Sequence, residues 1–296
     1  MSGKVTIREV TFLVLLATFW GSSSLFVKIA VTDIPPLTQA AVRVALGALV
    51  IYVIVRMRGD SLPRDWGTWG AAAVVALIGT VIPFFLIGWG LKTVDAALAA
   101  IAMASVPLYT LPLAHVMTRD ERLTPLKVTG VVIGFAGVAL LVSGSLDSGP
   151  INSLPGLIAI LVAALGYAVS GLLIRRIPAA RPTTTGAAIL IAATAMLVPL
   201  SLCFDQPWRL TPGTGAIASV MVLGVFATGA ALLLLIAIIN RAGATFASLN
   251  NYLVPVVGII CGVLWLDERL SPVAIIAFAI IMGGIFLTSR KIDPGP

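Results

Sequence analysis

Charged residues are scarce in this sequence. Only 10% of its 296 residues are Asp, Glu, Lys or Arg, whereas 59% are hydrophobic and the mean hydropathy is +1.09. A water-soluble globule of this size would need many more polar side chains to cover its surface. The composition therefore excludes a soluble protein and predicts a chain that lies in a lipid bilayer.

Histidine and cysteine are rarer still, with one His and two Cys. Cys203 and Cys261 both lie inside apolar runs, without the spacing of a metal site or of a disulfide framework. The sequence contains neither a G-x-S-x-G nor an H-E-x-x-H motif, and no pair of carboxylates is expected on one face. We therefore expect no metal, no other cofactor and no enzymatic activity.

Long apolar runs make up most of the chain. Each run lasts roughly 20 residues, which fits a membrane-spanning helix and not the alternating pattern of a barrel strand. Charged residues, prolines and glycines divide the runs into ten segments, at about 11–31, 37–57, 69–90, 95–118, 124–144, 154–175, 183–203, 214–238, 243–266 and 271–290. The sequence therefore predicts an all-α integral membrane protein with ten transmembrane helices.

The basic residues lie mainly in the short loops between these segments. If the N-terminus faces the cytoplasm, 14 of the 19 Lys and Arg residues lie on the cytoplasmic side and three lie on the other side. This bias follows the positive-inside rule, so the net charge of +7 indicates orientation and not a nucleic-acid partner. The first segment is longer than a signal-peptide core and lacks a clear cleavage site, so we expect it to remain as the first helix.

A charged hexapeptide occurs twice, as DERLTP at residues 120–125 and as DERLSP at residues 267–272. The two copies lie 147 positions apart, and each precedes the last apolar segment of one half of the chain. Because each half would hold five helices, an odd number, the second half would be upside down relative to the first. We therefore predict two inverted five-helix repeats, residues 1–147 and 148–296.

The ten segments, the duplication, the stretch WGSSSLFVK at residues 20–28 and the two charged hexapeptides resemble the drug/metabolite transporter superfamily, specifically its EamA-like members. The resemblance extends over essentially the whole chain. It implies the transporter fold of that superfamily and a carrier for small metabolites in the bacterial inner membrane. The distribution of basic residues predicts that both termini lie in the cytoplasm. Within the family, the sequence is most similar to the amino-acid exporters, including those for aromatic amino acids.

Several aromatic residues fall near the middle of predicted helices. Trp20 and Tyr167 occupy corresponding positions of the two repeats, and Tyr109 and Tyr252 also lie at mid-depth. A buried indole or phenol needs a hydrogen-bond partner, which in a membrane must come from the helix bundle or from a wet cavity. Helix packing and substrate contact both remain open. The candidate substrate-binding residues are Trp20, Ser23, Arg43, Met103, Tyr109, Tyr167, Asn251 and Tyr252.

No aspartate or glutamate lies in the interior of an apolar segment. Exporters of cationic drugs that exchange them for protons need a buried carboxylate, so this class is disfavoured. Lys28 and Arg43 are the two basic residues that the loops do not account for, and each side chain can either snorkel to the interface or attract a carboxylate into a cavity. A binding site for phosphorylated sugars would need several clustered Lys or Arg residues, so these substrates are disfavoured as well.

We therefore expect an exporter of small neutral amino acids with aromatic or other apolar side chains, working by alternating access without proton coupling. Its expected partners are the small-molecule substrate and the lipid bilayer. A carrier of another metabolite class, such as a drug, a sugar derivative or a lipid-linked headgroup, is the alternative. The sequence does not predict an oligomeric state.

Prolines mark the expected hinges and helix starts. Pro107 and Pro255 would free backbone carbonyls near mid-depth, so we expect the fourth and ninth helices to move. In the repeated hexapeptides, Thr124 and Ser271 are expected to cap the following helices, with a proline at the first helical position. The carboxylates of the hexapeptides would then lie near the positive end of a helix.

Overall fold

A computed structural model describes residues 6–118, 123–144, 153–177 and 181–289. Helices are the only regular secondary structure in this part of the chain. Ten helical spans are long and apolar enough to cross a membrane, which confirms the predicted number. The helices are α1 (Ile7–Gly21), α2 (Ser23–Ala30), α3 (Pro36–Met57), α4 (Trp66–Ala76), η1 (Leu77–Val81), α5 (Ile82–Gly90), α6 (Ala96–Met103), α7 (Val106–Met117), α8 (Pro125–Gly144), α9 (Leu154–Leu173), η2 (Ile174–Arg176), α10 (Pro182–Phe204), η3 (Pro207–Arg209), α11 (Thr214–Val222), η4 (Leu223–Ala230), α12 (Ala231–Ala242), α13 (Ala244–Ala247), α14 (Asn250–Trp265) and α15 (Pro272–Ser289).

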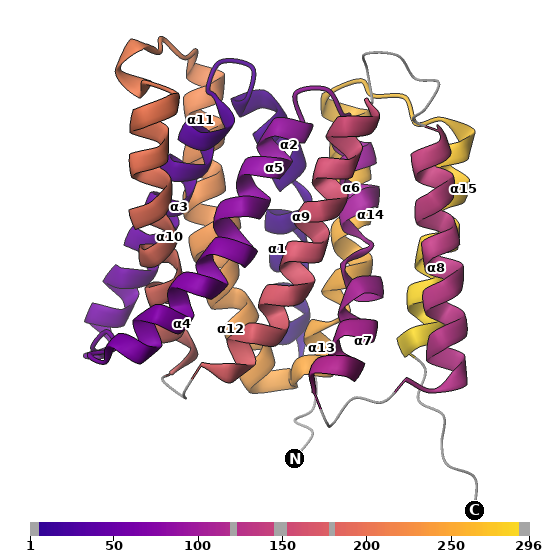
Figure 1. The fold of residues 1–296 in the computed structure, drawn as a ribbon, viewed down its shortest axis with the longest axis horizontal. Coiled ribbons are helices and arrows are strands. Elements are labelled where there is room, and N and C mark those ends of the chain that lie inside the picture. Colours follow the sequence, from indigo (N-terminus) through magenta and orange to yellow (C-terminus); the bar gives the residue numbers. More distant parts are fainter. Residues whose placement is uncertain (1–5, 119–122, 145–152, 178–180, 290–296) are drawn as a thin grey trace, which may run out of the picture.

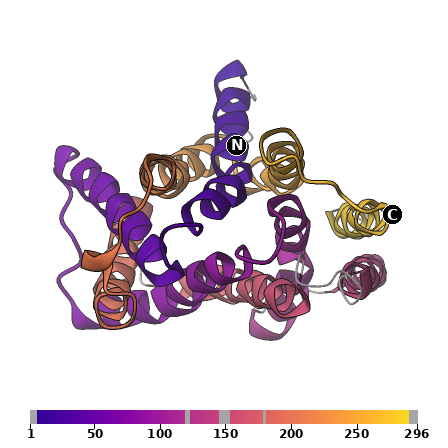
Figure 2. The same cartoon turned by 90° about the horizontal axis from the view of Figure 1, so that it is seen from above.

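The spans run up and down in turn, so α1 begins and α15 ends at the same end of the bundle (Figure 1). We call this end the terminal face and the opposite end, where α2 ends and α3 begins, the distal face. Viewed along the spans, most helices form a ring, while α8 and α15 lie together beside it (Figure 2). Within the ring, α3 packs against η4 and α5, α5 packs against α9, and η4 contacts α1.

Irregular turns interrupt several spans. The third and eighth spans each contain a π-helical segment, η1 and η4, at corresponding places along the two halves. The first span is divided at Ser22, the fourth at residues 104–105 and the ninth at residues 248–249. Such interruptions leave backbone groups outside the regular ladder and often occur at functional positions of helices.

Glycines allow α8 and α15 to pack with their backbones in close approach. A Cβ at Gly130 would lie 2.7 Å from the carbonyl oxygen of Gly284, and a Cβ at Gly137 would lie 3.0 Å from that of Ala277. Small residues at helix spacing commonly form such interfaces in membranes. Gly137 precedes Gly284 by 147 positions, and Gly130 precedes Ala277 by the same number, so the two contacts are equivalent under the repeat.

The hexapeptide caps lie where the sequence predicts them. The Ser271 hydroxyl accepts a hydrogen bond from the Ala274 amide at 3.1 Å, and the Thr124 hydroxyl accepts one from the Lys127 amide at 3.4 Å. Proline is the first residue of both α8 and α15. The carboxylates of the first copy, Asp120 and Glu121, lie outside the described residues.

Candidate functional site

Arg43 of α3 is a buried cation, with only 6% of its surface exposed. Its Nε donates a hydrogen bond to the Thr228 hydroxyl at 3.0 Å, and its guanidinium carbon lies 4.1 Å from the centre of the Phe84 ring. The Thr228 hydroxyl in turn donates to the carbonyl oxygen of Leu223 within the π-helical segment η4. Arg43 therefore does not snorkel to the membrane interface.

No carboxylate forms an ion pair with Arg43 among the described residues. Burial of an unpaired charge is costly, although contact with an aromatic face and one hydroxyl offsets part of the cost. A single carboxylate that reached Arg43 could form charge-assisted, two-pronged hydrogen bonds with its guanidinium. The site is thus able to bind one negative charge.

Aromatic side chains from three spans are linked to this cation, one directly and two through neighbouring groups. The Phe84 ring of α5 packs edge-on against Tyr167 of α9, with 6.4 Å between ring centres. Trp20 of α1 donates its indole N–H to the carbonyl oxygen of Ala227 at 3.2 Å, one residue before the Thr228 partner of Arg43. Trp20 and Arg43 therefore both bond to residues of η4. Tyr167 contacts the Phe84 ring, which in turn packs against the Arg43 guanidinium.

Gln39 lies one helical turn before Arg43, and the sequence argument missed it. Its side chain is 1% exposed, and its Nε2 is the one buried side-chain nitrogen without a hydrogen-bond partner among the described residues. Residues four apart lie on the same face of a helix, so this amide and the guanidinium are neighbours on α3. The sequence did contain a signal for Gln39, because two polar residues four positions apart in an apolar run lie on one face of the helix.

The other predicted binding residues lie elsewhere or are satisfied locally. Ser23 donates its hydroxyl to the carbonyl oxygen of Trp20 at 2.7 Å, and Met103 packs against the core around α6. Asn251 is exposed, whereas its neighbour Asn250 is 3% exposed and has a buried Oδ1 without a partner in the described part of the chain. Their role in substrate binding stays a prediction.

Tyr109 and Tyr252 contact the α8–α15 pair. The Tyr109 ring packs edge-on against Phe135 of α8 at 5.3 Å, and the Tyr252 hydroxyl lies 3.1 Å from that of Ser289 at the end of α15. These contacts join the ring of helices to the neighbouring pair. Packing, the alternative that the sequence left open, accounts for both tyrosines in this conformation.

The two predicted hinge prolines have different settings. Pro107 is the second residue of α7, immediately after the interruption at residues 104–105. Pro255 is buried within α14, and the interruption of its span at residues 248–249 comes earlier. In both spans, the interruption therefore precedes the proline. At each interruption, backbone hydrogen bonds that close over three residues replace some of the four-residue bonds of an α-helix.

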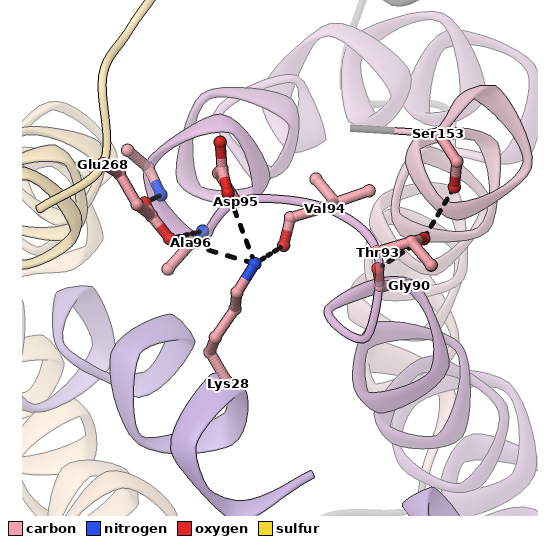
Figure 3. A network of polar contacts seen from close by, with 9 residues as sticks. Lys28, Gly90, Thr93, Val94, Asp95, Ala96, Ser153 and Glu268 are labelled. Atoms are coloured by element: carbon pink, nitrogen blue, oxygen red, sulfur yellow. Dashed lines mark hydrogen bonds and ion pairs between the residues drawn. The ribbon is translucent and has the colours of Figure 1, made fainter. Parts of the chain in front are cut away.

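Lys28 joins three elements at the distal face (Figure 3). Its Nζ donates to the carbonyl oxygen of Val94 at 2.6 Å and lies 3.4 Å from the Asp95 carboxylate and 4.0 Å from that of Glu268. Lys28 is thus engaged by the protein and is not extended toward the lipid headgroups.

Glu268, from the second hexapeptide, caps the start of α6 and not the start of its own following helix. Its two carboxylate oxygens accept hydrogen bonds from the Ala96 and Ala97 amides at 2.7 and 2.8 Å. Burial raises the pKa of Glu268, against the lowering effect of these two amides. The sequence argument placed this carboxylate near a positive helix end but could not identify a helix 172 positions away.

The described ranges contain no group of three or more His, Cys, Asp or Glu that could hold a metal ion. A family model described as the EamA-like transporter family matches residues 7–143 and, a second time, residues 154–290. Together these matches cover most of the chain.

Named relatives extend over nearly the whole chain. The uncharacterized inner membrane transporter YedA of Escherichia coli strain K12 is 27% identical over 281 residues, which cover 93% of this chain and 88% of YedA. The uncharacterized transporter YoaV of Bacillus subtilis strain 168 is 22% identical, with 91% of this chain and 92% of YoaV covered. A solved crystal structure with 22% identity matches 95% of this chain and 98% of its own with a TM-score of 0.68, which shows a shared fold.

Proposed function

The chain belongs to the EamA-like transporter family, and from this premise we propose that it exports small neutral amino acids with aromatic or other apolar side chains. The named relatives are transporters, and one is an inner membrane protein. The chain is accordingly a multi-pass transporter of the inner membrane that acts on a small molecule.

The observation that supports the substrate class is the buried cation at Arg43, with the Phe84 ring against it and no carboxylate partner among the described residues. One cation matches the one carboxylate of an amino acid. The rings of Phe84, Tyr167 and Trp20 offer an apolar surface to a side chain. Substrates with several phosphate charges would find too few cations in this group.

We also propose how the chain is organised in the membrane. Residues 1–147 and 148–296 would be inverted repeats, supported by the matching π-helical segments and by the equivalent glycine contacts of α8 and α15. The terminal face would lie in the cytoplasm, as the basic loops favour. Alternating access without proton coupling would then carry the substrate outward.

Counterflow in proteoliposomes at equal pH on both sides tests this proposal. Vesicles loaded with unlabelled phenylalanine should transiently accumulate labelled phenylalanine, and the uptake should survive a protonophore. Excess phenylalanine amide, which lacks the carboxylate, should compete at least tenfold less well than phenylalanine, because a charge-assisted pair is lost. Absence of counterflow for every neutral amino acid would refute the amino-acid assignment.

Variants locate the site within the same assay. Arg43→Met should reduce the counterflow rate about tenfold or more, whereas Arg209→Met, at an exposed arginine of the distal face, should leave it unchanged. Equal rates for Arg43→Met and the parent would show that the carboxylate binds elsewhere.

A further inference from the structure

Two short helices form the distal ends of the first and fourth spans. Both α2 and α6 are eight residues long, and each is separated from the longer helix of its span by an interruption. In the first span, the Ser23 hydroxyl bonds the Trp20 carbonyl beside the interruption at Ser22. Ser22 itself stays bonded to both helices, since its amide donates to the carbonyl oxygen of Thr18 at 3.0 Å and its carbonyl oxygen accepts from the Phe26 amide at 3.2 Å, so the interruption is a local bend at which the short helix can pivot.

The interruption in the fourth span has the tighter geometry of a 3₁₀ turn. The Ser105 amide donates to the carbonyl oxygen of Ala102 at 3.1 Å, and the Leu108 amide donates to that of Ser105 at 2.9 Å. These bonds close over three residues and not over the four of an α-helix, and stretches of this kind within a helix mark hinges. Pro107 directly afterwards prevents a regular ladder from forming across the turn.

The distal ends of these two helices are joined by polar contacts at the surface, above a buried apolar cluster that includes Val27 and Ala96. Lys28 of α2 bonds the Val94 carbonyl and pairs with Asp95, the residue before α6 (Figure 3). The Lys28 and Asp95 side chains are 26% and 21% exposed, so water can solvate both groups when they separate. A contact of this kind can be opened and closed at a lower cost than a buried apolar interface.

The loop between the ninth and tenth spans adds a third set of contacts at the distal face, those of Glu268 with the start of α6. Asp267 adopts a left-handed backbone, with φ of 53°, and the Glu268 amide bonds the carbonyl oxygen of Gly262 at 3.2 Å. This turn directs the Glu268 carboxylate back to the first amides of α6. Gly262 leaves the space for it, because a Cβ there would collide with the carboxylate and lie 2.8 Å from the Ala97 amide nitrogen.

We propose that Lys28, Asp95 and Glu268 form a latch that holds α2 and α6 together at the distal face, and that the carrier opens this face by releasing the latch and pivoting both helices at Ser22 and at residues 104–105. The inference rests on transport by alternating access and not on the identity of the substrate. Glu268 acts as the acceptor that fixes α6, and Lys28 as the donor that fixes α2.

Labelling of a buried cysteine in nanodiscs tests the latch. Val27→Cys, in a chain with Cys203→Ala and Cys261→Ala, places a thiol in α2 at a position that is 2% exposed and packs in one cluster with α6. A membrane-impermeant maleimide should modify it slowly in the parent. Glu268→Ala and Lys28→Met should each accelerate labelling about tenfold or more, because each removes charge-assisted contacts of the closed face.

Asp205→Ala is the matched control, because Asp205 also caps a helix from a distant segment. Its carboxylate accepts a hydrogen bond from the Thr38 amide at 2.7 Å in the first turn of α3, which is an uninterrupted helix. This variant should label like the parent. Equal acceleration in Asp205→Ala, or no acceleration in both latch variants, would overturn the proposal.

A conservative variant separates latch release from misfolding. Glu268→Gln keeps an oxygen that can accept from the α6 amides and should label within about threefold of the parent. If Glu268→Ala does not yield folded protein, the labelling rate of Lys28→Met alone tests the latch. The Lys28 side chain does not cap a helix, so its loss removes the latch contacts without removing a helix cap. The labelling requires no substrate, so a failure of the amino-acid assignment in counterflow leaves this test unaffected.

Discussion

The polar contacts at the two faces of the bundle differ in burial. At the distal face, the Glu268 side chain is 6% exposed and bonds two amides of α6 beside Lys28. At the terminal face the carboxylates are also largely buried, Glu9 with 8% and Asp60 with 11% of the side chain exposed, but their partners are exposed arginines: Arg241, 46% exposed, lies 3.7 Å from Glu9, and Arg181, 72% exposed, pairs with Asp60. The cation of the distal face, Lys28, is only 26% exposed. Exposed pairs contribute little to stability, whereas buried charge-assisted hydrogen bonds contribute more. The comparison therefore supports the proposed latch at the distal face.

Loss of the Glu268 carboxylate should have the largest effect on stability. Glu268→Ala removes a cap from two amides and a partner from Lys28, so we expect the free energy of unfolding to fall by about 2 kcal/mol. Unfolding in mixed micelles with increasing detergent denaturant measures this change. Arg269→Ala, at the exposed neighbouring residue, is the control and should be nearly neutral. An equal loss in both variants would show that the stability of this loop does not depend on the Glu268 cap.

Gly262→Ala should weaken the same latch without altering any charge. The added Cβ must displace the Glu268 carboxylate or the start of α6, so labelling of Val27→Cys should rise about fivefold. Combination with Glu268→Ala should add little, because both substitutions remove one interaction. Gly283→Ala of α15, where a Cβ would meet no atom within 4 Å, is the control and should not accelerate labelling.

Local signals predicted the spans and their caps. Apolar runs of about 20 residues gave the correct number of helices, and the Ser-Pro pair of the second hexapeptide correctly predicted the cap and first residue of α15. These features depend on neighbouring residues only. Sequence spacing also predicted a mid-depth position for Trp20 but left open whether Arg43 snorkels or faces a cavity, and the structure anchors both to consecutive residues of η4.

Contacts between distant segments could not be predicted in this way. The bond from Arg43 to Thr228 joins residues 185 positions apart, and Glu268 caps a helix that begins 172 positions earlier. Such pairs depend on how the spans pack, about which a single sequence carries no local signal. Gln39 was missed although it lies four residues before Arg43 in an apolar run, because this spacing alone does not show that its amide is buried beside the guanidinium.

A change of pH should shift the latch by a smaller factor. The charged groups that face Glu268 are Lys28 and Asp95, and burial raises the pKa of Glu268 above its ordinary value of 4.5 in the closed state. If release exposes the carboxyl to water, its pKa returns toward 4.5, so the closed state binds the proton more tightly. Acid therefore favours the closed state, and a rise of pH from 4.5 through the raised pKa favours release.

This dependence should appear in the ratio of two labelling rates at each pH, that of Val27→Cys and that of Val27→Cys combined with Glu268→Gln. The intrinsic pH dependence of thiol reactivity is the same in both chains and cancels in the ratio. We expect the ratio to rise with increasing pH, because the carboxyl group binds its proton more tightly in the closed state than in the open state. A flat ratio, or a ratio that falls as the pH rises, would show that Glu268 does not titrate with the latch.

The smallest effect should come from the terminal face. Arg241→Gln removes the pair with Glu9, but the arginine is 46% exposed and water replaces the lost contact. Labelling of Val27→Cys should change by less than about twofold, and 0.5 M salt should reduce even this difference because it screens exposed charges. An acceleration as large as that of Lys28→Met would mean that the two faces are coupled and that the terminal pair helps to hold the distal latch. A small, salt-sensitive change would instead show that the latch closes the distal face by its own contacts.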